Sequence, residues 1–144
     1  MRLSAEDKVE LSRYRMEKAK RLLADAERLL GSASHESSVN RSYYAVLTSA
    51  RALLALRGAD DETRDRVRTL LSKEFIRTGD LPRELGETFR SIQARRLDSD
   101  YGDYVEIGVD EASDSLKRAQ AFVATAEEVM NRLVSVTPRG GSSH

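Results

Sequence analysis

Hydrophobic residues recur every three or four positions along most of the chain, which is the spacing of one face of an α-helix. The pattern predicts five helices, over residues 4–31, 35–58, 61–78, 82–97 and 110–134. Ser4 is a typical N-cap, and Gly31, Gly58 and Gly79 stand where helices commonly stop. Pro82 is expected in the first turn of the fourth helix, because its missing N–H is not needed there. The acidic stretch DSDYGDY (residues 98–104) is expected to end that helix.

Each predicted helix carries an apolar stripe that must be buried against its neighbours. The second helix contributes Val39, Tyr43, Val46, Leu47, Ala50, Leu53 and Leu54. The last helix contributes Ala112, Leu116, Ala119, Val123, Ala126, Met130 and Leu133. Sequential amphipathic helices with short connections bury such stripes most readily in an all-α fold, an antiparallel up-down bundle of four to five helices.

The size and composition of the chain favour one helical domain over residues 1–136. A chain of 144 residues with 40% hydrophobic content can bury one core and leaves little for a second. The tail TPRGGSSH (residues 137–144) has no apolar residue to hold it down, so we expect it to be disordered.

Charge and residue usage narrow the function classes. The 24 basic and 24 acidic residues cancel, so any binding of nucleic acid must depend on a local cluster. The absence of cysteine excludes disulfides and thiolate metal sites, and no metal-spaced histidine pair or glycine-rich phosphate loop occurs. We expect no metal and no cofactor. No apolar signal or spanning segment is evident, which favours a cytoplasmic protein that does not enter a membrane.

The second helix contains the most informative stretch, SVNRSYYAVLTSARALLALRG (residues 38–58), with three arginines and no acid. Arg41, Tyr44 and Thr48 share one side of this helix, and two turns, about 10.5 Å, separate the first from the last. Two interpretations of Arg41 stay open. It binds an external anion, or it pairs with the segment from Asp98 to Glu111, which contains six acids and no base.

Five stretches of the chain resemble the HEPN domain. They are KAKRLLADAERLL near the start, followed by VNRSYYAVLTSARALLALRG, KEFIRTGDLPRELGETF, RLDSDYGDY and ASDSLKRAQAFV. The resemblance covers roughly residues 14–126 and is to the small stand-alone prokaryotic branch of that family. It implies a helical bundle, usually dimeric. Many HEPN proteins are metal-independent ribonucleases, whereas others bind nucleotides or nucleic acid without catalysis. Several are encoded beside a minimal nucleotidyltransferase, as toxin and antitoxin.

The ribonuclease motif of the family is a polar residue and an arginine followed, after four to six residues, by a histidine. Asn40 and Arg41 match the first two positions, but Thr48 stands where the histidine of this branch normally lies. Arg64 and Arg66 stand where relatives tend to have a histidine and a glycine. A threonine hydroxyl does not titrate near neutral pH and cannot act as general acid or base there.

Three hypotheses follow from the resemblance and its departures. The first is a catalytically degenerate binding module and homodimer that contacts RNA, a nucleotide or a nucleotidyltransferase through Asn40, Arg41, Tyr44 and Arg51. The second is an active metal-independent endoribonuclease that uses Arg41 with a non-standard acid or base, for which His35 is the first candidate because the other histidine, His144, lies in the tail. The third is a purely structural partner of a nucleotidyltransferase.

Overall fold

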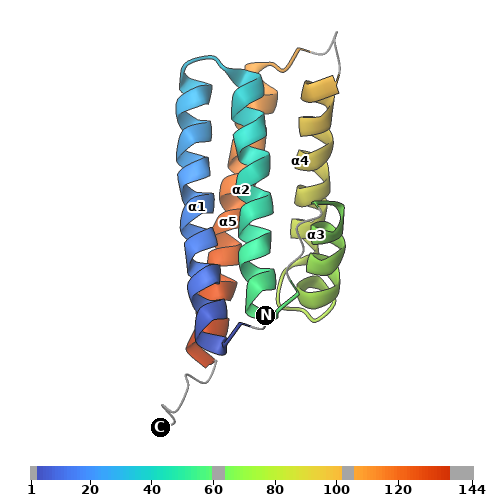
Figure 1. The fold of residues 1–144 in the computed structure, drawn as a ribbon. Helices are drawn as coiled ribbons and strands as arrows, with labels where there is room; N and C mark the ends of the chain where they lie inside the picture. The colour runs from blue at the N-terminus through green and yellow to red at the C-terminus, as the bar shows by residue number, and fades with distance from the viewer. Residues whose placement is uncertain (1–2, 60–63, 102–105, 137–144) are drawn as a thin grey trace.

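The computed structural model describes residues 3–59, 64–101 and 106–136 of the chain. Within these ranges the elements are α1 (Ala5–Gly31), α2 (His35–Leu56), α3 (Arg64–Leu71), the π-helical turn η1 (Ser72–Ile76), α4 (Arg83–Tyr101) and α5 (Val109–Val136). Figure 1 shows α1, α2, α4 and α5 running along the long axis in alternating directions, with α3 near one end of α4. The described residues form no strand, and the predicted all-α bundle is confirmed.

The first two helices begin and end close to the predicted residues. The Ser4 hydroxyl accepts a hydrogen bond from the Asp7 backbone N–H at 3.0 Å, and the Ser4 N–H donates to the Asp7 carboxylate at 3.4 Å. This capping box satisfies amides that have no partner within the helix. The helix that it starts ends at Gly31, and α2 follows after a short turn.

The third and fourth helices differ from the prediction. The prediction of an uninterrupted third helix over residues 61–78 is wrong for the described part of that range, because α3 is followed by the π-helical turn η1. At this turn the Arg77 N–H donates to the Ser72 carbonyl, five residues earlier, at 2.9 Å. Pro82 directly precedes α4 rather than lying in its first turn. Helix α4 also runs to Tyr101, so it continues into the acidic stretch. Residues 102–105 and the tail 137–144 lie outside the described residues.

Helix α2 lies at the centre of the hydrophobic core. All seven residues of its predicted apolar stripe are buried, and six of the seven in α5 are buried, with Leu133 partly buried. Small residues make up much of the remaining buried surface of α2: Ser38, Ser42, Ala45, Ser49, Ala52 and Ala55. Because small side chains allow helix axes to approach closely, α1, α4 and α5 all pack directly against α2. Among the described residues, no helix is both long enough and apolar enough to cross a bilayer.

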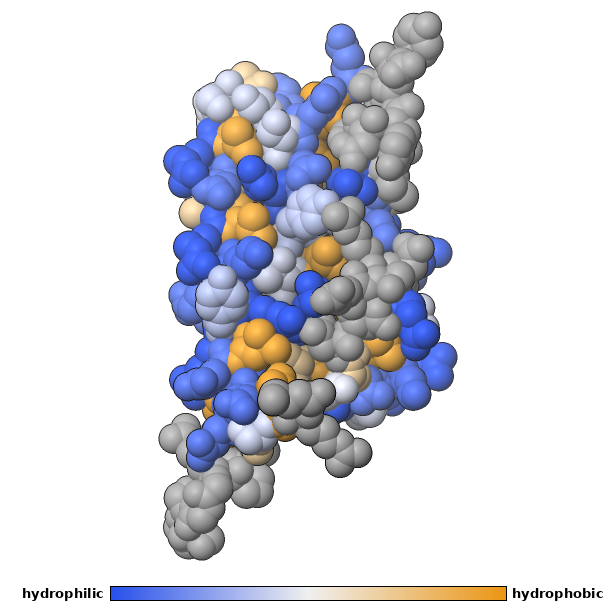
Figure 2. Space-filling model, in the orientation of Figure 1, coloured by the Kyte–Doolittle hydropathy of each residue, from blue (hydrophilic) through white to orange (hydrophobic). Residues whose placement is uncertain are grey.

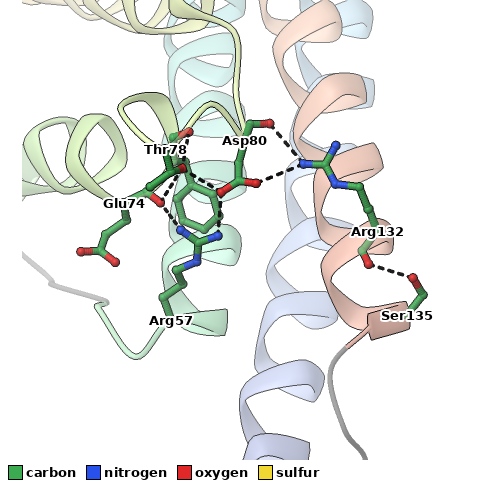
Figure 3. A network of polar contacts seen from close by, with 7 residues as sticks. Arg57, Glu74, Thr78, Asp80, Arg132 and Ser135 are labelled. Carbon is green, nitrogen blue, oxygen red and sulfur yellow. Dashed lines mark hydrogen bonds and ion pairs between the residues drawn. The ribbon is translucent and has the colours of Figure 1, made fainter.

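A polar cluster ties the end of α2 to η1 and the loop that follows (Figure 3). The Arg57 guanidinium donates to the Asp80 carboxylate at 2.8 Å and to the Glu74 carbonyl. Its carbon also lies 4.2 Å from the centroid of the Phe75 ring, in cation–π geometry. One arginine therefore holds three points of the segment between α3 and α4.

Asp80 is the common acceptor of this cluster. Its carboxylate accepts from Arg57 and also from the Thr78 hydroxyl at 2.7 Å, and Arg132 of α5 donates to its carbonyl and its carboxylate at 3.4 Å. The hydrogen bond from Arg57, followed by that from Thr78, holds the pKa of Asp80 below its ordinary value. The cluster thus links α2, η1 and α5 through one ionised carboxylate.

Replacing Asp80 by asparagine should lower the free energy of unfolding by about 1–2 kcal/mol at neutral pH, because the Arg57 and Thr78 donors lose a charged acceptor. Urea unfolding followed by circular dichroism measures this. The matched control is Asp25→Asn, which removes an exposed ion pair with Arg28 within α1 and should cost less than about 0.5 kcal/mol. Equal losses in the two variants would contradict a special role for Asp80.

The same variant has an expected pH dependence. Since folding lowers the pKa of Asp80 from 3.8, its contribution is complete above that value and is lost as the pH falls through the lower folded value. The difference in stability between the native chain and Asp80→Asn should therefore shrink in acid.

Candidate functional site

The polar side of α2 forms one continuous line of residues. Arg41, Tyr44, Thr48 and Arg51 follow one another at spacings of three, four and three, so they lie on the same face over about 15 Å. Arg41 is exposed, while the other three and Asn40 are half-buried. We call the five residues Asn40, Arg41, Tyr44, Thr48 and Arg51 the α2 polar face. The site residues predicted from the sequence therefore lie together on one helix, with Asn40 at the edge of the line.

The Arg41 side chain forms no hydrogen bond or ion pair with the residues that the structure describes. In particular, it does not pair with Glu106, Asp110 or Glu111, the acids of the predicted partner segment whose side chains are described. The arginine that meets the start of α5 is Arg95, which donates to the Glu111 carbonyl and to the Asp114 carboxylate, both at 3.1 Å. The rest of the acidic segment lies outside the described side chains.

An arginine that the sequence pattern gave no role completes the aromatic part of this face. Tyr43 is buried, and its ring meets that of Tyr44 edge to face with centroids 5.1 Å apart. The Arg96 guanidinium of α4 lies 5.3 Å from the Tyr43 centroid and 5.8 Å from the Tyr44 centroid. Both rings are thus in cation–π range of one cation, which fixes the position of Tyr44 beside Arg41. Arg96 is the first residue of RLDSDYGDY, but only the packing of α4 on α2 reveals its contact.

The far end of the α2 polar face also meets helix α1. The Arg15 guanidinium donates to the backbone carbonyl of Arg51 at 3.3 Å. A second arginine is thereby held against Arg51 at this end of the face. Figure 2 shows hydrophobic patches set among hydrophilic residues on the side of the molecule formed by α1 and α2.

His35 does not lie on this face. It begins α2, six residues before Arg41, which places it about 120° around the helix from that arginine. There it lines an open depression of about 450 Å³ with Ser34, Glu36, Glu106 and Ile107. The imidazole therefore lies away from the line of Arg41 and Thr48 in this structure. Among the described residues, no three histidine, aspartate or glutamate side chains are arranged to hold a metal ion.

These features define an all-helical module with a basic and aromatic line on its central helix, and comparison with known proteins identifies its family. The HEPN domain model matches residues 12–129. The chain therefore belongs to the HEPN domain family, as the resemblance in its sequence indicates.

Individual relatives agree with this assignment. A UPF0332 protein of Thermotoga maritima is 30% identical over 127 residues, which cover 88% of this chain and 96% of that protein. A UPF0332 protein of Archaeoglobus fulgidus is 30% identical over 126 residues, covering 88% and 98%. A protein named "Putative toxin MJ0142" from Methanocaldococcus jannaschii is 31% identical over 108 residues, covering 75% and 74%. The similarity thus spans most of the chain in each case.

Proposed function

We propose that the chain is a non-catalytic HEPN binding module whose α2 polar face contacts a phosphate group of RNA or of a nucleotide. The observation that carries the proposal is the state of Arg41, which is exposed and has no hydrogen bond or ion pair with the described residues. A guanidinium presents a planar set of donors that matches two oxygens of a phosphate. Tyr44, held by Arg96 and Tyr43, adds a hydroxyl and a ring edge next to it.

The residue two turns from Arg41 supports the non-catalytic part of the proposal. In cleavage by internal attack, the ribose 2′-oxygen bonds to phosphorus while the bond to the 5′-oxygen breaks. One group must take the 2′-hydroxyl proton and another must protonate the departing oxygen. Thr48 can do neither near neutral pH. Arg41 by itself supplies only charge to the transition state.

An active endoribonuclease is the second candidate. Its support is the Asn40–Arg41 pair in the family's motif position and the similarity to a protein named as a toxin. In this alternative Arg41 stabilises the pentacoordinate phosphorus and a group other than Thr48 moves the protons. A toxin–antitoxin role and a nucleotidyltransferase partner belong to both candidates, and a nucleotidyltransferase gene beside this one would support them.

We also propose that the module forms a homodimer through the side of α2 that carries Arg41. A two-fold contact along one helix brings the same residue of both copies near a common axis, so two arginines would border one groove. Light scattering at several concentrations should give the mass of a dimer. A monomer at every concentration would contradict this assembly and leave the binding proposal to stand on a single chain.

Arg41→Ala should weaken binding of a short single-stranded RNA by roughly tenfold, because one charge-assisted contact is worth about 1.5–3 kcal/mol. Fluorescence anisotropy of a labelled RNA measures this at two salt concentrations, and native binding should weaken at the higher one. Arg21→Ala is the matched control, since Arg21 is also exposed and forms no hydrogen bond or ion pair with the described residues. Salt-independent binding, or equal effects of both substitutions, would refute the proposed face.

Restoring the family motif should create an enzyme. The native chain should cleave RNA weakly or not at all without metal, whereas Thr48→His should raise the rate by about 10² to 10⁴, the usual contribution of a positioned acid or base. Adding Arg41→Ala to Thr48→His should abolish the gain. Gel assays in the presence of EDTA, which removes divalent metal ions, measure the rate of RNA cleavage by all three proteins. Robust cleavage by the native chain that is lost with Arg41→Ala would instead establish the endoribonuclease, and His35→Ala would then test the remaining histidine.

A further inference from the structure

A cleft between α3–η1 and α4 collects arginines from both walls. It has a volume of about 360 Å³, and Arg68 and Arg77 line it on one side while Arg83 and Arg90 line it on the other. Among the described residues, Glu87 is the only acid in its lining. Four arginines and one glutamate give the described lining side chains a net charge of +3, in a chain whose formal net charge is zero. We call these four arginines and their surroundings the arginine cleft.

Of the four arginines, only Arg90 forms an ion pair with a described residue. Glu87 pairs with Arg90 at 2.8 Å, one turn along α4. Arg68, Arg77 and Arg83 form no side-chain hydrogen bond or ion pair with the residues that the structure describes. Like charges gathered around one cleft repel one another, so the arrangement lowers stability unless an anion enters it.

The π turn explains how Arg68 and Arg77 come to line the same cleft. On an uninterrupted α-helix, nine residues correspond to 900°, so the two side chains would point to opposite faces. The wide turn at Ser72–Ile76 lies between them and holds more than 3.6 residues, so it reduces this angle. Single π turns occur often at functional sites, since they redirect side chains at the expense of regular hydrogen bonding.

The opposite wall of the cleft is one face of α4, and a glycine lets the two walls approach each other. Arg83, Glu87 and Arg90 follow at spacings of four and three, which places them on one face of α4. Gly86 lies between them, and a Cβ there would stand 3.1 Å from the Ile76 Cδ1, so the absence of a side chain lets the two walls approach. The N-terminus of α4, with its positive dipole end, opens beside Arg83 and adds to the field of the arginines.

We infer that the arginine cleft is a second anion site, which binds adjacent phosphate groups of a nucleotide or of an RNA strand. The volume is within the range of small-molecule sites, about 300–1,000 Å³. Guanidinium groups on two facing walls can clamp neighbouring phosphates from both sides, and each can donate two parallel hydrogen bonds. The inference does not depend on the α2 polar face, because it rests on other residues of other helices.

Binding of ATP and of a labelled ten-nucleotide RNA to the full chain tests the inference. The variant is Arg77→Ala combined with Arg83→Ala, both exposed positions outside the hydrophobic core. It should weaken binding of at least one probe by roughly a hundredfold, about tenfold for each arginine. For the RNA, it should also reduce the slope of log affinity against log salt by about 0.7 for each phosphate that the protein no longer neutralises. Loss of ATP binding identifies a nucleotide as the ligand, and loss confined to RNA identifies the strand.

Two controls make the result decisive. Arg13→Ala combined with Arg21→Ala removes the same charge from exposed positions of α1 and should change affinity less than about threefold. Arg68→Lys keeps the charge but loses the planar donor pair, and it should weaken binding severalfold without altering the melting temperature. Undetectable binding of both probes, or equal losses in the two double variants, would overturn the inference. If only Arg41→Ala weakens RNA binding, the arginine cleft is not the site and the α2 polar face stands alone.

Discussion

The tight packing of α2 against three other helices is the constraint on which the rest of the structure depends. Its small residues, such as Ala45, Ser49 and Ala52, leave room for α1, α4 and α5 to approach from separate sides. A helix so enclosed has only a narrow strip left for chemistry. The polar residues at 41, 44, 48 and 51 occupy that strip, so the core and the α2 polar face are two consequences of one arrangement. A larger residue at one of the small positions would separate the helices and displace the strip with them.

The charge layout shows how a neutral chain can present local basic surfaces. Several charged side chains form ion pairs within the fold: Arg57 and Arg132 with Asp80, Arg95 and Arg118 with Asp114, and Lys20 with Glu127. Arg41 and three arginines of the arginine cleft form no such pairs with the described residues. Overall neutrality therefore says little about where an anion can bind, since the pairing of acids with particular arginines decides which cations remain available.

The residues that form the HEPN fold of this chain are not the residues of the family's ribonuclease motif. The family match extends over residues 12–129, a range that includes most of the hydrophobic core. Catalysis through the histidine of the family's motif would require a titratable group where this chain has Thr48. Since the fold tolerates a threonine on the half-exposed side of α2, stability imposes no histidine at this position. Arg41 is likewise not required by the core, which makes its presence in the motif position an argument for binding.

The sequence by itself determined the all-helical class, the bounds of the first two helices and the buried face of α2, because periodicity and capping are local properties read over a few turns. It also placed Arg41, Tyr44 and Thr48 on one side of that helix, since one helix fixes their spacing. Only the tertiary structure decided that Arg96 lies over the two tyrosines and that Arg57 and Asp80 meet. The arginine cleft could also be found only from the tertiary structure, because the π turn breaks the 3.6-residue period on which any helical-wheel prediction depends. The packing between helices depends on how side chains of several elements fit at once, and no local pattern in the chain encodes that fit.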